Sequence, residues 1–500
     1  MIRHLSYLAA LALSAQAAPT FKVERMPNPS GVDPQIGGVA TLPDGRVAAV
    51  FHRGELMIYD PAKKSWTKFA EGLQEPLGIL AESASTFVVM QRSELTRIKD
   101  SDGDGKADDY ETVFDGFGMS GNYHEFAFGP AKGPDGFYYI ALNLGSNGAG
   151  IREEIRGRWS ELGVLDFKQM VHDPNWGKRN KDAGRMYSRV PYRGWIMRVS
   201  PDGKSSEPFG CGFRSPEGIG FDAQGNLLVT DNEGDWRGTS PLQIVKRGSF
   251  NGHPASLVWQ EGWDEGDPRM LPVPKLNEMR TKETGRFPQG DLANSPTQPV
   301  IIPESWGPYA GQVVFGEMNQ NRMVRYLPDD VDGFRQCALL PMFDGTDLGN
   351  GNHRLAFAPD GGLWVGKTHL SWAGAEGLVK ITPVEVEKAF ILTSVKLEKA
   401  GESQAFRLRF SQPVASGQDK VAGNRFDYLY RQDYGSPKID EAALTLGTPV
   451  LSEDKRELVI PLTAKQGAIH RIDLKSLRAA DGAALDGQVF YYQATKLPPG

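Results

Sequence analysis

One phrase recurs along this chain: an apolar strand, a Pro-Asp-Gly-type turn and a second apolar strand. Its four copies turn at residues 43–45, 134–136, 223–225 and 359–361. Such turns between apolar runs predict tight β-hairpins, because glycine and aspartate tolerate the positive φ that a two-residue turn requires. A hairpin cannot bury both of its faces alone. Copies spaced tens of residues apart therefore predict blades packed around an axis, with binding groups at the mouth of a central channel.

The repeat-like units predict the domain organisation. Six units begin at Gly37, Leu77, His124, Glu217, Gly311 and Arg354, and residues 21–25 are a candidate for the strand that closes the ring. From Glu385 onward, alternating strands continue without the phrase. We therefore predict an all-β protein, with a six-bladed β-propeller over residues 18–384 and a separate small β-sandwich over residues 389–500. The abundant glycine and proline agree with a turn-rich chain.

Two stretches interrupt this rhythm. Residues 143–194 are rich in Arg, Trp and Gly, and residues 250–306 are rich in Pro, Glu and Trp. Structureless stretches of this length are uncommon in compact domains unless they are lids or binding loops. We expect both to carry functional groups, including aromatic rings that could stack on a sugar.

The first residues predict export. Arg3 is followed by the apolar stretch 5–13 and by Ala15-Gln-Ala17, the pattern of a secretory signal peptide over residues 1–17. The alternative is a buried N-terminal helix. No later stretch approaches the roughly 20 apolar residues of a membrane span, so we expect a secreted or periplasmic protein.

Charge and cysteine content restrict the partners. The net charge is -6 and no basic run is present, so the sequence offers no footprint for nucleic acid. Cys211 and Cys337 could pair in an oxidising compartment, and the sequence leaves that open. The chain has no Cys-x-x-Cys-His motif for covalent haem.

An acidic loop matches a known calcium-binding pattern. Its oxygen donors follow the required spacing: Asp100, Asp102, Asp104, the Lys106 carbonyl, Asp108 (through water) and Glu111. Gly105 stands at the sharp turn, and such a donor set suits a hard cation that takes 6–8 oxygens. No amphipathic helices flank the loop, so we expect a structural calcium site and not a sensor. The alternative is an exposed acidic turn.

A second group of residues is spread along the chain. His124, Arg214 and Arg354 each stand just before an apolar strand at the start of a repeat. Equivalent positions in different blades lie near the axis at one mouth of a propeller, so the three side chains could share a site. A histidine of this kind could also be a hydrogen-bonded bystander.

These positions resemble the soluble glucose/sorbosone dehydrogenases over roughly residues 35–383. Members of that family are six-bladed propellers that use pyrroloquinoline quinone (PQQ) and calcium. The resemblance implies that His124 is the general base, that Arg214 contacts the cofactor near its reacting carbonyl, and that Arg354 holds a cofactor carboxylate. It also implies a second calcium ion near Asn232-Glu233-Gly234.

A closer resemblance is to the secreted dehydrogenase-like propellers abundant in planctomycetes and verrucomicrobia. Residues 311–372 carry it, as does the phrase Tyr-Leu-Tyr-Arg-Gln-Asp-Tyr-Gly-Ser-Pro at 428–437. The cytochrome module that members often carry is missing here. The chain also departs from the dehydrogenase pattern: Ser215 stands in place of an asparagine, and Asn352 in place of an arginine. Each lost cation removes a charge-assisted contact to PQQ worth roughly 1.5–3 kcal/mol.

Three functions follow from the sequence. The first is a PQQ- and calcium-dependent sugar dehydrogenase that passes hydride from a carbohydrate hydroxyl to the quinone and then to an external electron acceptor. The second is a non-catalytic propeller that binds a carbohydrate or a partner. The third is a calcium-dependent lactonase, with Glu125, Asn232, Glu233 and Asn352 as candidate metal ligands. The fold alone does not choose among them.

Overall fold

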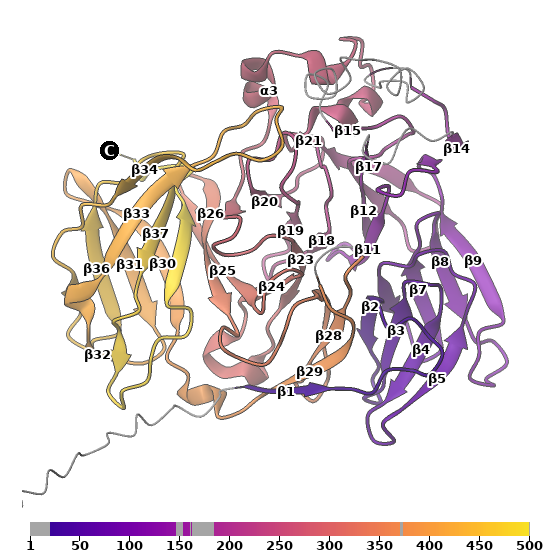
Figure 1. Cartoon of the computed structure of the whole chain (residues 1–500), viewed down its shortest axis with the longest axis horizontal. Helices are drawn as coiled ribbons and strands as arrows, with labels where there is room; N and C mark the ends of the chain where they lie inside the picture. The colour runs from indigo at the N-terminus through magenta and orange to yellow at the C-terminus, as the bar shows by residue number, and fades with distance from the viewer. Residues whose placement is uncertain (1–20, 147–153, 161, 163–184, 371–373, 500) are drawn as a thin grey trace, which may run out of the picture.

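The computed structural model describes residues 21–146, 154–160, 162, 185–370 and 374–499, and its architecture is all-β (Figure 1). The predicted signal peptide lies outside these residues, as does most of the stretch 147–184. The blades of a propeller fill the centre and right of the view, and a β-sandwich packs against them at the left.

The first three blades follow in chain order, each given from its inner to its outer strand. Blade 1 contains β2 (Ile36–Thr41), β3 (Val47–Phe51), β4 (Leu56–Asp60) and β5 (Ser65–Ala70). Blade 2 contains β6 (Ile79–Ala81), β7 (Thr86–Met90), β8 (Leu95–Lys99) and β9 (Asp109–Phe114). Blade 3 contains β11 (Ala127–Lys132), β12 (Tyr138–Leu142), β16 (Trp195–Val199), β17 (Ser206–Cys211) and the parallel strand β21 (Ser249–Phe250).

The other three blades complete the ring. Blade 4 contains β18 (Gly218–Phe221), β19 (Leu227–Thr230), β20 (Ser240–Ile244) and β22 (Gly285–Phe287). Blade 5 contains β23 (Pro296–Ile301), β24 (Val313–Glu317), β25 (Met323–Val331) and β26 (Phe334–Met342). Blade 6 contains β27 (Asn352–Phe357), β28 (Leu363–Lys367), β29 (Gly377–Pro383) and, from the start of the described chain, β1 (Phe21–Arg25).

The innermost strands form a closed circuit. Each contacts the next in the order β2, β6, β11, β18, β23 and β27, and β27 contacts β2. β1 pairs with β29, so the expected closing strand at residues 21–25 is present. The burial pattern follows the same geometry: β3 is buried at every position, whereas the outer strand β5 is exposed over most of its length. This confirms the six-bladed propeller.

The recurring phrase forms hairpins as predicted. Its four copies are the two innermost strands of blades 1, 3, 4 and 6. The turn glycines take the positive φ that such turns require, for example +86° at Gly45 and +82° at Gly361.

The fifth unit begins earlier than predicted. Its inner strand is β23, which begins at Pro296, and the predicted start at Gly311 lies just before the second strand, β24. β23 contains Pro296 and Pro299, and its register shifts between them. Proline removes a ladder donor and usually argues against a strand, which is why the sequence pattern missed it.

The stretch 250–306 is therefore not one long loop. It holds β22, β23 and several short helices: η2 (Pro254–Trp259), η3 (Pro268–Met270), α3 (Val273–Met279) and the start of η4 (Glu304–Tyr309). Two short strand pairs lie beside the other long stretch: β10 (Met119–Ser120) with β14 (Glu154–Arg156), and β13 (Gly145–Ser146) with β15 (Met186–Tyr187). The helix α3 and the strands β14 and β15 lie at the top of the view, in a layer over one mouth of the propeller (Figure 1).

The C-terminal residues form a sandwich that shares a sheet with blade 5. Its first sheet contains β30 (Leu392–Ala400), β31 (Ser403–Phe410), β36 (Glu457–Leu462) and β35 (Val450–Leu451). Its second sheet contains β39 (Val489–Gln493), β37 (Ile469–Asp473), β33 (Ala422–Asp427) and β34 (Ile439–Ala443), and β39 pairs with β26 of blade 5. Two short helices, η5 (Val386–Lys388) and η6 (Gln418–Lys420), and one strand pair, β32 (Val414–Ser416) with β38 (Arg478–Ala479), complete it.

The sandwich core extends into the propeller. Leu327 and Leu340 of blade 5 belong to the same buried cluster as Phe406 and Phe490 of the sandwich. The sequence change near residue 385 did not reveal this shared sheet.

Two further expectations concern cysteines and membranes. Cys211 and Cys337 are both buried and unpaired. Among the described residues, no helix has the length and apolar character needed to cross a membrane.

We predict that the closing strand contributes strongly to stability through Phe21. This side chain is 7 % exposed and packs on the rings of Trp306 and Phe343. Phe21→Ala should lower the free energy of unfolding by about 3–5 kcal/mol. Lys22→Ala, a substitution at the exposed neighbouring residue, should change the free energy of unfolding by no more than about 0.5 kcal/mol. Denaturant titration of both variants measures this, and equal effects would contradict the role of β1.

Candidate functional site

A cavity of about 370 Å³ lies at the mouth where the inner strands begin. Blades 3, 4 and 5 supply most of its wall, and one residue comes from the C-terminal region. The lining residues are His124, Phe126, Phe128, Arg214, Ser215, Glu217, Asn232, Glu233, Gln289, Asn294, Ser295, Met318, Asn319, Leu370 and Tyr434. The structure thus brings together four residues that the sequence singled out: His124, Arg214, Asn232 and Glu233.

His124 is held in one tautomer. Its backbone N–H donates to Asn122 Oδ1 at 3.0 Å, and its ring Nδ1 lies 2.8 Å from the Leu144 carbonyl oxygen. A carbonyl can only accept, so Nδ1 carries the proton and Nε2 carries the lone pair. Within the described chain Nε2 has no hydrogen-bond partner, and the residue lines the cavity. The cavity wall therefore includes an unprotonated imidazole nitrogen.

The charge state of His124 agrees with this tautomer. Burial and the nearby positive charge of Arg214 lower the pKa of His124 to about 3, against the weaker opposing effect of the hydrogen bond to Leu144. The ring is neutral at pH 7. An anion bound to Arg214 would weaken the effect of its positive charge on the ring, and the pKa of His124 would rise.

Arg214 is positioned by a buried carboxylate. The backbone N–H groups of Arg214 and Ser215 donate to Asp231 at 2.9 and 2.6 Å, and Asp231 also accepts from Arg237 Nε at 2.8 Å. Asp231 and Arg237 are both buried. This network fixes the turn before β18, and with it the point from which the Arg214 side chain enters the site.

The Arg214 guanidinium is incompletely satisfied. Its Nε is buried and has no partner in the part of the chain that the structure describes. Gly234 makes room for it, because a Cβ there would lie 2.1 Å from Nε. A buried donor without a partner is costly. Because Nε is closed off against Gly234, a ligand in the cavity would meet Arg214 through its Nη groups, for which the described residues supply no hydrogen-bond partner.

Carboxylates and neutral polar groups surround this cation. The Glu217 carboxylate accepts from Asn232 Nδ2 at 2.9 Å and from the Ser295 hydroxyl at 2.8 Å. Burial raises the pKa of Glu233, although Arg214 opposes the shift. Glu233 is therefore easier to protonate than an exposed glutamate, and it has oxygen atoms to offer a cation.

Arg354 lies outside the main cavity. Its guanidinium donates to the carbonyl oxygens of Leu77, Glu217 and His353, and it packs 4.9 Å from the centre of the Phe128 ring. It lines a separate space of about 20 Å³ in the channel beneath. The structure therefore does not bring Arg354 together with His124 and Arg214 in one cavity.

The sequence missed Tyr434, which reaches the cavity from the C-terminal region. It belongs to residues 428–437, which we call the C-terminal arm, between β33 and β34. In Figure 1 this segment runs from the sandwich towards the propeller mouth. Its phrase was visible in the sequence only as part of a family resemblance, with nothing in the pattern to place it at the site.

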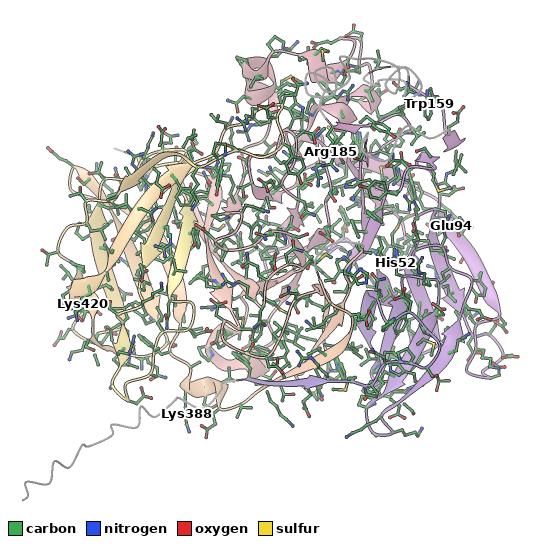
Figure 2. The ribbon with its side chains drawn as sticks, in the orientation of Figure 1. His52, Glu94, Trp159, Arg185, Lys388 and Lys420 are labelled. Carbon is green, nitrogen blue, oxygen red and sulfur yellow. The ribbon has the colours of Figure 1, made fainter. Side chains whose placement is uncertain are left out.

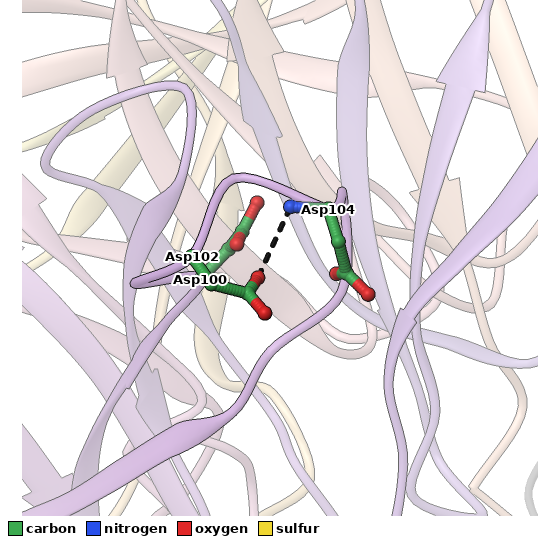
Figure 3. A group of neighbouring side chains, drawn as sticks. All are labelled: Asp100, Asp102 and Asp104. Atoms are coloured by element: carbon green, nitrogen blue, oxygen red, sulfur yellow. Dashed lines mark hydrogen bonds between the residues drawn. The ribbon is translucent and has the colours of Figure 1, made fainter.

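The acidic loop gathers three of its predicted donors. Three carboxylate oxygens, one from each of Asp100, Asp102 and Asp104, lie within 4.8 Å of one another (Figure 3). Asp100 also accepts from the Gly103 and Gly105 backbone at 2.7 and 3.0 Å, which folds the loop around its carboxylate.

The other predicted donors of the loop are placed differently. Asp108 accepts from the Ser101 backbone at 2.9 Å, and Lys106 donates its N–H to Asp104 at 2.8 Å. Glu111 lies on β9 and pairs with Arg97 at 2.8 Å, away from the three aspartates. The bidentate position of the calcium pattern is thus engaged with an arginine.

Two of the four candidate metal ligands for a lactonase, Glu125 and Asn352, make their contacts away from the cavity. Glu125 accepts from the backbone and hydroxyl of Ser120, and Asn352 Oδ1 accepts from Lys367 Nζ at 2.7 Å. Neither residue lines the cavity. Asn232 and Glu233 alone cannot supply the ring of ligands that a catalytic axial metal needs.

Comparison with known proteins gives a partial family match and distant structural likenesses. The model of a domain of unknown function (DUF7133) matches residues 59–256, which is less than half of the chain. No curated protein matches the sequence.

Several solved structures are similar to this chain. A putative oxidoreductase (glucose dehydrogenase) from Thermus thermophilus is 15 % identical, with 72 % of this chain and 100 % of that chain covered and a TM-score of 0.48. The PQQ-bound aldose sugar dehydrogenase from Streptomyces coelicolor is 17 % identical, with 73 % and 99 % covered and a TM-score of 0.41. The holo PQQ domain of pyranose dehydrogenase from Coprinopsis cinerea is 14 % identical, with 73 % and 96 % covered and a TM-score of 0.47.

We predict that His124 makes the fold sensitive to acid. The pKa of histidine is near 6.5 in an unfolded chain and about 3 for His124 in the folded protein. Between these values the unfolded state binds the extra proton, so stability is unaffected above about pH 6.5 and falls as the pH drops towards 3. The loss has a limit of about 1.4 kcal/mol per pH unit. His124→Gln should remove this contribution, and its melting temperature should fall less than that of the wild type between pH 7 and 4. Parallel curves would contradict a buried neutral His124.

Proposed function

We propose that this chain is an exported, PQQ- and calcium-dependent dehydrogenase that acts on a small carbohydrate. The observation that carries the proposal is the unprotonated Nε2 of His124, which faces a polar cavity shared with the incompletely satisfied cation Arg214. A lone pair beside a fixed positive charge is suited to removing a proton from a hydroxyl group. Electrons would leave through an external acceptor.

The donors of the cavity fit one acidic group of the quinone. Arg214 would hold that group through its Nη groups, and amides such as Gln289 and Asn294 would face the remaining polar edge. Phe126 and Phe128 give the wall apolar rings against which a flat molecule can pack. When bound, PQQ supplies a two-electron acceptor for hydride. Because the described residues supply a single arginine to the wall, affinity should depend on a calcium ion near Asn232 and Glu233.

The protein's own contribution to the chemistry is proton transfer and charge stabilisation. A substrate hydroxyl within hydrogen-bond reach of His124 Nε2 would give up its proton to that nitrogen. The positive charge of Arg214 would stabilise negative charge that develops beside it. An acidic group held against Arg214 would also raise the pKa of His124, so that loading the site would make the base stronger.

A non-catalytic carbohydrate-binding propeller is the second candidate. The low pKa of His124, about 3, makes it a weak base in the unloaded site, and the amide-rich cavity could bind sugar hydroxyls without any reaction. The lactonase function is less well supported, because Glu125 and Asn352 make their contacts outside the cavity.

We predict that the chain without residues 1–17 reduces a redox dye when supplied with PQQ, calcium and a suitable sugar. His124→Gln should lower kcat by about 10²–10⁴-fold, the usual contribution of a general base. His470→Gln is the matched control, since His470 is buried in the sandwich and should leave the rate unchanged. Sugar binding without turnover in the wild type would favour the second candidate, and binding of neither sugar nor PQQ would overturn both.

We also propose that the three-aspartate loop binds structural calcium. Saturating calcium should raise the melting temperature, and a concentration 100 times the Kd corresponds to about 2.7 kcal/mol of stabilisation. Asp102→Asn with Asp104→Asn should abolish this shift. Asp109→Asn is the control, because Asp109 is an exposed carboxylate on β9 outside the group. A calcium shift that survives the double substitution would place the ion elsewhere.

A further inference from the structure

The C-terminal arm (residues 428–437) is bound to the propeller along its length. It runs beside residues 234–238, the segment that follows Asn232 and Glu233. The Gly435 N–H donates to the Gly234 carbonyl at 2.9 Å, the Ser436 N–H donates to the Gly238 carbonyl at 3.0 Å, and the Trp236 N–H donates to the Arg431 carbonyl at 3.0 Å. Asp235 and Tyr434 form an antiparallel bridge.

Side chains anchor the base of the arm. The Tyr430 hydroxyl donates to the Gly252 carbonyl at 2.6 Å, and the Tyr430 ring lies 5.4 Å from that of Trp236. The guanidinium of Arg280 lies 4.4 Å from the centre of the Tyr430 ring. A segment with this many backbone and side-chain contacts presents its tip in a defined position.

The tip contacts two charged groups of the cavity wall, Arg214 and Glu233. The guanidinium carbon of Arg214 lies 5.5 Å from the centre of the Tyr434 ring. Gly435 packs against Glu233, because a Cβ on Gly435 would lie 2.3 Å from Glu233 Oε1. Arg185 contacts the same ring at 5.6 Å, and Figure 2 shows it in the layer of loops over the mouth.

The Tyr434 side chain is only partly covered by the rest of the protein. It is 49 % exposed at the edge of the cavity, although large aromatic residues are usually buried. Ring contact with an arginine is worth most where water is excluded, as at the buried Arg214. The tyrosine is therefore well placed to restrain Arg214, the one arginine or lysine among the described residues that line the cavity.

We propose that the C-terminal arm is a working part of the propeller site, with Tyr434 and Gly435 as positioning residues for Arg214 and Glu233. This inference rests on the proposed function. It predicts that affinity for an acidic cofactor depends on two residues of the sandwich region, which make no catalytic contact of their own. The propeller segment alone carries an incomplete cavity.

The first test uses Tyr434 in the full-length mature chain. Binding of PQQ in the presence of calcium is followed by quenching of tryptophan fluorescence, without substrate or turnover. Tyr434→Ala should weaken binding roughly 3- to 30-fold, the range expected for a lost cation–ring contact. Tyr434→Phe keeps the ring and should bind like the wild type. Tyr110→Ala, at a tyrosine of similar exposure on β9, is the control and should also leave binding unchanged.

The second test separates contact with Glu233 from backbone strain. Gly435 has a φ of +62° and Gly401 a φ of +64°, so an added Cβ strains both backbones alike. A Cβ on Gly401 meets nothing within 4 Å, whereas one on Gly435 meets Glu233. Gly435→Ala and Gly401→Ala should therefore be destabilised by the same backbone strain, but only Gly435→Ala should weaken PQQ binding.

The outcomes distinguish this inference from the function on which it rests. If the wild type binds PQQ and the arm variants bind it as well as their controls do, the role of the arm is overturned and the proposed function stands. If the wild type does not bind PQQ, the proposed cofactor is overturned and the inference falls with it. Weaker binding confined to Tyr434→Ala and Gly435→Ala supports the inference.

Discussion

A twisted four-stranded sheet has two faces to bury, and in this chain each propeller sheet buries them against its neighbours. The contacts between successive inner strands, from β2 round to β27 and back, make this arrangement complete. The pairing of β1 with β29 ties the start of the described chain to the last blade. Every functional position depends on this ring, because it brings the turn before β11 and the turn before β18 to the same mouth. Residues 90 positions apart, His124 and Arg214, thereby share one cavity.

The chemistry of that cavity follows from the different surroundings of His124 and Arg214. His124 is neutral because burial and Arg214 disfavour its protonated form. The backbone around Arg214 is fixed by Asp231, yet its side chain keeps an unpartnered donor. A site with a neutral base and an unsatisfied cation is prepared for a ligand that carries both a hydroxyl and an acidic group, or for two ligands that supply one each. That requirement links the proposed sugar substrate to the proposed quinone.

Features that depend on local chemistry could be predicted from the sequence. The hairpins were predictable because their turns need glycine at positive φ, and the equivalent positions of His124 and Arg214 follow from the repeats. The sequence pattern missed β23 because this inner strand contains two prolines, which are unusual in strands, and a register shift between them. Arg354 was expected just before its inner strand, as His124 and Arg214 are, but it lies within β27, and its guanidinium turns to backbone carbonyls in the channel. The repeat pattern indicates which segments form most of the inner strands, and it does not show which way a long side chain points.

Tyr434 shows a different limit. The residue reaches the cavity only because a loop of the sandwich pairs with the segment 234–238, about 200 positions earlier in the chain. No periodicity records such a contact. The donors of the acidic loop show the same limit on a smaller scale, since the spacing that matched the calcium pattern left Glu111 on an outer strand beside Arg97.

The pairing of β26 with β39 also has a mechanical consequence. Through Ala338 with Tyr492 and Leu339 with Tyr491, one continuous sheet runs from blade 5 into the sandwich. A hinge between the two parts would have to break this ladder and open the apolar core behind it. The sandwich therefore moves with the propeller as a rigid extension. Residues 428–437 lie outside this ladder, so this segment could bend beside Tyr434 without breaking the shared sheet, and the rate of ligand exchange would then depend on its flexibility.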